Sequence, residues 1–216
     1  MIGPESLIDH NVGVAKDRDI QTFDERSKSY DEGWLGQWHG DVVDRVAALA
    51  RRSAPGATRV LDVGCGTGLL LEKLLGLLPK AASVHGVDPA PGMVEQASVR
   101  AAGRFEVRVG TAEQLPFPDA SMDLVVTSMS FDHWADQQAG LNECRRVLRQ
   151  RGILVLADLC AAWMLPTTLV GRGRGRARTP RVMIAMCVRA GLKPQILSQV
   201  QRVGPLPVVQ AIVAER

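Results

Sequence analysis

Three glycines stand at alternate positions in the segment VLDVGCGTG, residues 60–68, and point to a ligand-binding turn. An apolar run with the character of a buried strand leads directly into Gly64, Gly66 and Gly68, and a helix is expected to follow. Glycines at such a join let the backbone bend sharply and let a ligand approach where a Cβ atom would collide. The segment therefore predicts a nucleotide-type site, although a tight turn without a ligand would use the same glycines.

The residues around this turn favour a sulfonium nucleoside over a dinucleotide. The dinucleotide pattern GxGxxG needs its third glycine at position 69, which is Leu69. Asp62 precedes the turn, where its carboxylate would repel a pyrophosphate but can hold the ammonium of an amino-acid ligand. The turn has no Lys or Arg to meet phosphate, and no Lys-Ser/Thr pair follows it as in a P-loop. A nicotinamide oxidoreductase is therefore the weaker hypothesis.

A second carboxylate, Asp88, stands 20 residues after Gly68 at the end of the next predicted strand. An acid at that point of a nucleotide-binding sheet accepts hydrogen bonds from both ribose hydroxyls. Taken alone, Asp88 could equally be the N-cap of the helix that follows it. Its spacing from the glycine turn favours the ribose role.

The elements that must position these residues alternate between strands and helices. Apolar, β-branched runs predict strands over 59–64, 83–88, 105–110, 122–129 and 152–159, and the last two runs, QILSQVQRV and LPVVQAIVAER, predict an antiparallel pair at the sheet edge. Helices are predicted over 68–78, 91–102, 136–149 and 180–190. This order predicts an α/β fold: a Rossmann-like, doubly wound, mostly parallel seven-stranded sheet with an antiparallel edge strand.

The start of the chain differs in character from this alternating part. Four of the nine aromatic residues, Phe23, Tyr30, Trp34 and Trp38, lie within 16 positions, and an amphipathic helix is predicted around 40–51. We expect residues 1–55 to form an N-terminal helical cap over the strand ends and residues 56–216 to form the ligand-binding domain.

Four segments in this order resemble the class I S-adenosylmethionine-dependent methyltransferases: VLDVGCGTGLLL, VHGVDPAPGMVEQA, GTAEQLPFPDASMDLVVTSMSFDHWAD and ECRRVLRQRGILVLADL. The chain is most similar to the small-molecule group that includes quinone-biosynthesis and natural-product enzymes, over about residues 20–160. The resemblance implies S-adenosyl-L-methionine as cofactor, S-adenosyl-L-homocysteine as product, and no metal. Methyl transfer of this kind is an in-line displacement at an activated carbon, so the protein mainly positions the acceptor and excludes water.

The resemblance also implies which residues hold the cofactor. Asp62 and the three glycines would surround the methionine part, Asp88 would bind the ribose, and Met93 would pack on the adenine. The remaining cofactor residues would be Thr111, Ala112 and Glu113 at the adenine edge, Tyr30 at the methionine end, and Ser128 at the end of the fourth strand. Relatives often carry an aspartate where this chain has Thr111, so we expect weaker electrostatic assistance there. The LRPGG turn of relatives is LRQRG here, at 148–152, far from the chemistry.

On the acceptor side, His133 in SMSFDHWAD is the candidate general base, because it follows the fourth strand and imidazole is the usual base near pH 7. Asp132 or Asp136 could orient its ring. The alternative is that His133 caps or packs at the start of the next helix. His39 in the cap is a second candidate base. Four further aromatic residues either line an acceptor pocket or merely dock the cap: Trp34, Trp38, Phe131 and Trp134.

The charge distribution argues against a nucleic-acid partner. The net charge of +3 depends on four arginines in GRGRGRAR, within residues 171–178, and without them it would be −1. One arginine loop without a basic groove gives little neutralisation of a nucleic-acid backbone. The loop is either solvated or recognises an anionic group of the acceptor.

The remaining signals indicate a cytoplasmic enzyme with a small-molecule acceptor. The four cysteines lack CxxC spacing, which favours reduced thiols and argues against a zinc site. No secretory signal and no apolar run of about 20 residues is present, so we expect no membrane partner. We expect a monomer or homodimer that methylates an aromatic or hydrophobic small molecule, O-methylation being favoured over N- or C-methylation. A catalytically silent cofactor-binding scaffold is the alternative.

Overall fold

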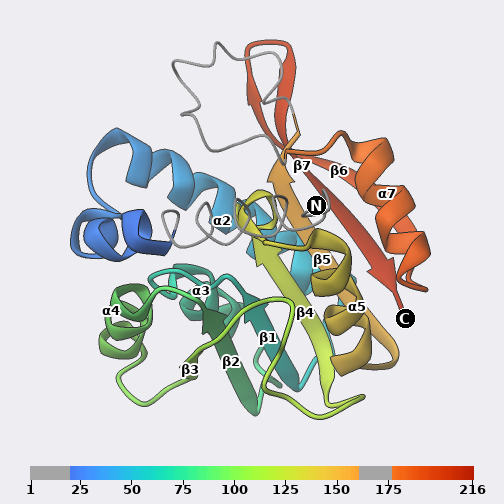
Figure 1. Ribbon diagram of the computed structural model, residues 1–216, viewed down its shortest axis with the longest axis horizontal. Helices are drawn as coiled ribbons and strands as arrows, with labels where there is room; N and C mark the ends of the chain where they lie inside the picture. The colour runs from blue at the N-terminus through green and yellow to red at the C-terminus, as the bar shows by residue number, and fades with distance from the viewer. Residues whose placement is uncertain (1–19, 161–176) are drawn as a thin grey trace, which may run out of the picture.

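A seven-stranded sheet forms the centre of the computed structural model, which describes residues 20–160 and 177–216 (Figure 1). The strand order is β3-β2-β1-β4-β5-β7-β6. The strands are β1 (Arg59–Val63), β2 (Ser83–Asp88), β3 (Glu106–Val109), β4 (Met122–Ser128), β5 (Leu148–Leu159), β6 (Lys193–Val203) and β7 (Leu206–Glu215). The first five are parallel where they pair, and β7 is antiparallel to both of its neighbours. The predicted Rossmann-like, mostly parallel sheet is confirmed.

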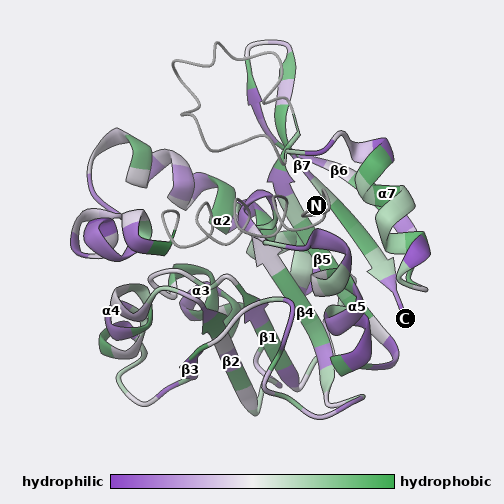
Figure 2. Ribbon diagram, viewed as in Figure 1, coloured by the Kyte–Doolittle hydropathy of each residue, from purple (hydrophilic) through white to green (hydrophobic). Residues whose placement is uncertain are grey.

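Helices cover both faces of the sheet, as a doubly wound fold requires. They are α2 (Gly33–Ser53), α3 (Leu69–Leu77), α4 (Pro91–Ala101), α5 (Gln137–Val147) and α7 (Pro180–Arg189), with 3-10 turns η1 (Ser27–Ser29) and η2 (Phe131–His133). Consecutive residues of β4 point to opposite faces, because side chains alternate along a strand. Leu124 and Val126 pack in one apolar cluster with α2 and α3, whereas Val125 packs in the other with α5 and α7. The hydropathy colouring of Figure 2 shows this apolar character along the central strands.

The antiparallel strand lies one position inside the sheet edge. β7 is inserted between β5 and β6, and its residues Val208, Val209 and Ala211 to Ala214 are buried. Most of β6 is exposed or half-buried. The more apolar strand of the hairpin therefore takes the inner position, and the more polar strand forms the edge.

Strand β5 begins at Leu148, four residues earlier than the sequence predicts. Leu148 pairs with Met122, and the register then shifts before Leu124 pairs with Ile153. Arg151 has φ +62°, a left-handed conformation that the LRQRG segment adopts without the glycine of the related turn. The irregular pairing absorbs the extra residues, so the expected turn is the bulged start of a strand.

The described part of the cap, residues 20–55, is helical and continues into the core. Residues 20–26 are helical, and α2 starts at Gly33, well before the predicted helix at 40–51. The second half of α2 buries Val42, Val43 and Val46 against the sheet. The helix predicted around 40–51 covers this half. The first half of α2 carries few buried residues, so it has no amphipathic pattern that would predict a helix.

Candidate functional site

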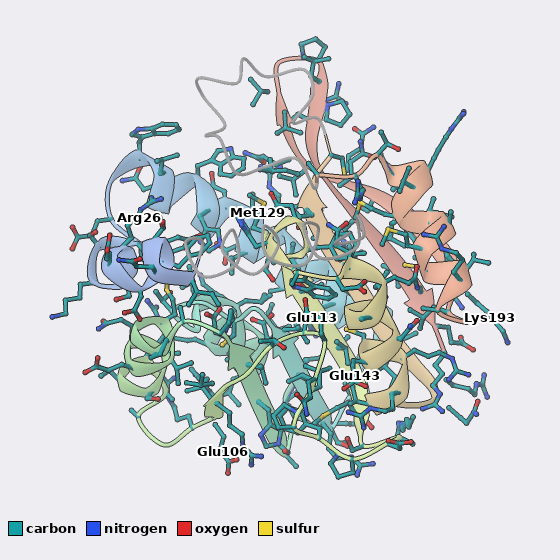
Figure 3. All side chains as sticks on the ribbon, viewed as in Figure 1. Arg26, Glu106, Glu113, Met129, Glu143 and Lys193 are labelled. Carbon is teal, nitrogen blue, oxygen red and sulfur yellow. The ribbon has the colours of Figure 1, made fainter. Side chains whose placement is uncertain are left out.

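A cleft of about 1000 Å³ lies at the carboxyl ends of β1, β2 and β4, beneath the cap. The strand order reverses at β1, which has β2 on one side and β4 on the other, so the connections leave a crevice at this point. Met129 and Glu113, two lining residues labelled in Figure 3, follow β4 and β3 at this edge of the sheet. The cleft includes space open to solvent.

Most of the residues proposed for cofactor binding line this cleft. They are Tyr30, Asp62, Gly64, Gly66, Asp88, Met93, Thr111, Ala112, Glu113 and Ser128. Both candidate bases, His39 and His133, also line it, together with Trp134. Gly68, Trp34, Trp38 and Phe131 are not among the lining residues.

The three glycines of the turn have different local roles. All have positive φ, at +74° for Gly64, +52° for Gly66 and +80° for Gly68. A Cβ atom at Gly64 would collide with Ser130, whereas one at Gly66 would meet no protein atom within 4 Å. A Cβ at Gly68 would lie 3.1 to 3.3 Å from Ala97 and Phe105. Gly66 therefore leaves open space for a ligand, and Gly68 allows α3 to pack closely on its neighbours.

The Gly68→Ala variant should be less stable than the wild type by about 1–2 kcal/mol, since its left-handed backbone strains any residue with a Cβ. Urea denaturation followed by circular dichroism measures this difference. Gly76→Ala is the matched control, because Gly76 is exposed in α3 and a Cβ there meets nothing within 4 Å. That variant should gain about 0.5–1 kcal/mol. Equal effects of the two substitutions would contradict the requirement for glycine at position 68.

Asp62 is a buried carboxylate without a full set of partners. The residue is 1% exposed, and its Oδ1 atom makes no hydrogen bond within the described residues. Burial, and then the charge of Asp88, raises the pKa of Asp62 to about 8. A buried carboxylate oxygen that faces a ligand cleft without a donor is costly in the free protein. A ligand that brings a cationic donor would remove this cost.

Asp88 shapes the glycine turn as well as facing the cleft. Its Oδ2 accepts a hydrogen bond from the Gly66 backbone N–H and its Oδ1 accepts one from the Ala90 N–H, both at 2.9 Å. Burial raises the pKa of Asp88, while these two hydrogen bonds act in the opposite direction. A carboxylate oxygen can accept more than one hydrogen bond, so both oxygens retain capacity for ligand hydroxyls. The alternative that Asp88 is the N-cap of the next helix is wrong, because Ala90 is the N-cap of α4.

The adenine-side candidates combine ligand-facing and structural roles. Met93 is 1% exposed, and Thr111 forms an isolated β-bridge with Gln114. The Oε1 atom of Glu113 accepts a hydrogen bond of 3.0 Å from the Asp136 N–H, which connects this loop to the start of α5. Ser128 presents a buried hydroxyl oxygen that has no hydrogen-bond partner among the described residues.

His133 follows β4 on the short turn η2, with a buried acid beside it. Its Nε2 lies 3.3 Å from Oδ1 of Asp132, whose side chain is 3% exposed. Asp136 has another task, because it caps α5 by accepting hydrogen bonds from the N–H groups of Gln138 and Ala139. Of the two acids proposed to orient His133, only Asp132 contacts the ring.

A second buried acid, Asp158, contacts the backbone of Asp132. Oδ2 of Asp158 accepts a hydrogen bond of 3.1 Å from the Asp132 backbone N–H. Burial, and then the charge of Asp132, raises the pKa of Asp158 well above its usual value. The charge of Asp132 therefore disfavours ionisation of Asp158.

The cap supplies a series of rings along the cleft. Phe23 packs edge-on against His133 with ring centroids 4.9 Å apart, and it also contacts Tyr30 at 6.1 Å. Tyr30 in turn packs edge-on against His39 at 5.4 Å. The sequence predicts that Phe23 belongs to the cap, but it does not predict that Phe23 lines the cleft. The available signal was its distance of seven residues from Tyr30, which is two helical turns.

The rings proposed from the sequence as acceptor-pocket residues are dispersed. Trp34 is 73% exposed, and Trp38 is partly buried against the apolar cluster of α2. Phe131 is 1% exposed and packs against Trp134 in the other cluster. Trp34 and Trp38 do not line the cleft, whereas Tyr30 and His39 do.

Two lining residues had no signal in the sequence. Met129 has φ +57°, a conformation that residues other than glycine rarely adopt and that is often found at functional sites. The Ser130 hydroxyl donates to the Val63 carbonyl at 3.2 Å and accepts from the Trp134 indole N–H at 3.0 Å. Neither a backbone angle nor a hydrogen bond across the sheet is visible in residue types alone.

Some expectations concern features outside the site. Within the described residues, no cluster of metal-binding side chains is found, and no helix is long and apolar enough to cross a membrane. All four cysteines are unpaired and buried. Most of the arginine loop at 171–178 lies outside the described residues, except that Arg178 donates a hydrogen bond of 2.8 Å to Oε1 of Gln137.

Comparisons with known proteins agree with this geometry. Residues 61–156 match a family model described as "Methyltransferase domain". The chain is 33% identical over 147 residues to a malonyl-[acyl-carrier protein] O-methyltransferase of Hahella chejuensis, which covers 68% of this chain and 51% of that protein. It is 35% identical over 119 residues to a ubiquinone/menaquinone biosynthesis C-methyltransferase of Geobacter sp.. This match covers 53% of this chain and 51% of that protein. The chain thus spans about half the length of these relatives.

Solved structures show the same fold. A SAM dependent methyltransferase from Aquifex aeolicus superposes with a TM-score of 0.71 at 19% identity, covering 89% of this chain and 97% of that chain. The YcgJ protein from Bacillus subtilis superposes with a TM-score of 0.61 at 23% identity, covering 79% and 95%. At these identities the similarity establishes the architecture.

Proposed function

We propose that this chain, in which residues 61–156 match the methyltransferase-domain family model, is a class I S-adenosylmethionine-dependent methyltransferase that transfers a methyl group to a small-molecule acceptor. The observation that carries the proposal is Asp62, a buried carboxylate with an unpartnered oxygen beside the open space at Gly66. We further propose that residues 1–55 act as a cap over the domain formed by residues 56–216.

The residues present fit this cofactor. Its ammonium group would satisfy the unpartnered oxygen of Asp62, and the open face of Gly66 has room for a ligand where a Cβ would stand. Asp88 would bind the ribose, and the buried Ser128 hydroxyl is available for a further hydrogen bond to the cofactor. The other proposed contacts are Gly64, Gly68, Met93, Thr111, Ala112 and Glu113, with Tyr30 at the methionine end. When bound, the cofactor supplies a methyl carbon that its positive sulfur activates.

The chain's own residues then have three tasks: to position the acceptor, to exclude water and to take up a proton. The cap rings Phe23 and Tyr30 exclude water from the cleft. We propose His133 as the base that removes the acceptor's proton. Asp132, with its Oδ1 3.3 Å from Nε2, would stabilise the imidazolium that forms.

The proposed acceptor is an aromatic or hydrophobic molecule with a hydroxyl group. The support is a cleft walled by the rings of Phe23, Tyr30 and Trp134 and containing two imidazoles. A neutral hydroxyl needs a base, which favours O-methylation for a site with His133. The names of the relatives include both O- and C-methyltransferases, so the site of methylation needs direct measurement.

Incubation of the purified protein with methyl-labelled S-adenosylmethionine and a panel of acceptors tests the proposal. The panel would include 1-naphthol, 1,4-dihydroxynaphthalene and malonyl-coenzyme A, with products located by mass spectrometry and NMR. We expect label on a hydroxyl oxygen of an aromatic member. Calorimetry that shows no cofactor binding at high micromolar concentration would sink the proposal. Cofactor binding without transfer to any of a broad panel would favour a silent scaffold instead.

The Asp88→Ala variant should bind S-adenosylmethionine about 10- to 100-fold more weakly, because it loses the carboxylate that accepts hydrogen bonds from the ribose hydroxyls. It also loses the bond that holds the Gly66 N–H. Isothermal titration calorimetry measures the affinity. Asp119→Ala is a control, because Asp119 is exposed outside the cleft and pairs with Arg146. Unchanged affinity in the Asp88 variant would remove this residue from the cofactor site.

A further inference from the structure

The cap contributes a histidine to the cleft that the proposed reaction leaves unassigned. His39 belongs to α2 and lines the cleft beside Tyr30. Its Nδ1 atom is fully buried and makes no hydrogen bond within the described residues. Burial of a polar atom without a partner costs free energy. The Nδ1 atom of His39 therefore carries this cost in the ligand-free protein.

A carboxylate lies in the same neighbourhood. Burial lowers the pKa of His39, and the nearby charge of Asp31 acts against this shift. Oδ1 of Asp31 is also fully buried without a hydrogen bond. An imidazole Nδ1 that can donate and a carboxylate oxygen that can only accept form a complementary pair. Such pairs are often too long in a ligand-free structure and tighten when ligands bind.

The second oxygen of Asp31 connects this pair to the cofactor-binding turn. Oδ2 accepts hydrogen bonds from the Thr67 hydroxyl at 2.8 Å and from Arg100 at 2.6 Å. Thr67 stands between Gly66 and Gly68 and lines the cleft, and Arg100 also donates to the Thr67 carbonyl at 2.9 Å. The cap carboxylate next to His39 is thus fixed to the turn that would hold the cofactor.

From this geometry, and resting on the proposed function, we propose that His39 recognises a hydroxyl or N–H group of the acceptor, with Asp31 as its positioning residue. Asp31 accepts the Nδ1–H of the neutral ring, and this tautomer presents the Nε2 lone pair to the cleft. Because Nε2 of this tautomer can only accept a hydrogen bond, it selects a methyl-acceptor molecule that carries a hydrogen-bond donor at the end near the cap. Phenols and quinols have such a donor, whereas their ethers do not.

A binding experiment with the protein loaded with S-adenosylhomocysteine tests this inference without methyl transfer. The probes are 1,4-dihydroxynaphthalene and 4-methoxy-1-naphthol, which share a ring system and the hydroxyl that would face His133 but differ in the second O–H group. Calorimetry should show that the wild type prefers 1,4-dihydroxynaphthalene by about 10- to 100-fold, the effect of leaving a buried polar group unsatisfied. His39→Phe should abolish the preference. His85→Gln, a histidine of β2 outside the cleft lining, should retain it.

Equal affinity of the wild type for the two probes, binding of neither, or a preference that survives in His39→Phe would overturn the proposal. Thermal melting by circular dichroism checks that each variant folds. Absence of methyl transfer to every acceptor would count against the proposed function and leave these binding results intact, so the two failures are distinguishable.

NMR of the histidine side chains tests the role of Asp31 separately. With ¹⁵N-labelled histidine, the S-adenosylhomocysteine complex should show a protected imidazole N–H proton on Nδ1 of His39. Asp31→Asn should lose this signal, since an amide oxygen binds the proton more weakly than a carboxylate. A signal absent from the wild-type complex, or unchanged in Asp31→Asn, would show that Asp31 does not hold the ring.

Discussion

The Asp62→Asn variant should bind S-adenosylmethionine about 100-fold more weakly than the wild type, because a buried charge-assisted hydrogen bond to the ammonium is lost. The same substitution should stabilise the ligand-free protein at pH 9. Both effects have one cause: in the free protein, the carboxylate is buried with one oxygen unpartnered. A residue that destabilises the empty protein and is needed for binding is typical of functional sites.

The sign of the pH effect follows from the pKa of Asp62. Burial raises it from 3.8 to about 8, so between these values the folded protein holds a proton that the unfolded chain releases. The stability contributed by Asp62 is therefore fully present below pH 3.8 and is lost as the pH rises through 8. Asparagine has no proton to lose. At pH 9 the variant should exceed the wild type by about 1–3 kcal/mol.

Denaturation with urea at pH 6 and pH 9, together with calorimetry of cofactor binding, measures both effects. Asp123→Asn is the matched control, a buried acid at the opposite end of β1 and β4. Burial alone would raise the pKa of Asp123, but hydrogen bonds from Thr58 and Arg59 and the charge of Arg149 lower it overall. That variant should lose stability and keep its cofactor affinity. Loss of stability in Asp62→Asn at pH 9 would contradict our interpretation of the site.

The His133→Ala variant should turn over at least about 100-fold more slowly while cofactor affinity stays nearly intact. The imidazole lines the cleft, where we propose that it takes the proton of the acceptor hydroxyl, and Asp132 beside it would stabilise the charged ring. Loss of the base affects the reaction step and not the binding of the cofactor. Steady-state kinetics with the best acceptor of the panel, and calorimetry with S-adenosylhomocysteine, separate the two quantities.

Two further variants define what His133 does. Asp132→Asn should also lower kcat, by less than the loss of the ring itself, because it removes the charge but leaves the base. His85→Gln is the control, since His85 does not line the cleft. Turnover like that of the wild type in His133→Ala would show that this imidazole is not the base, and would leave the packing role against Phe23 as its function.

The sequence by itself determined the glycine turn, the two acids beside it and the strand–helix alternation that carries them. Asp62, Gly66 and Asp88 lie in a strand, a turn and the end of the next strand, and residue type with short-range spacing defines these positions. Only the tertiary structure determined which residues lie on the acceptor side of the cleft. It brought Phe23 and His39 into the cleft, left Trp34 exposed, and connected Asp31 to Thr67.

The physical reason is the range of the interactions. Period-two and period-3.6 patterns report which face of an element is buried, and they sufficed for the core half of α2 and for the buried strands. Which side chain of the cap meets which strand end depends on packing between segments far apart in the chain. Asp31 and Arg100, or Phe23 and His133, meet only once the cap is folded onto the sheet.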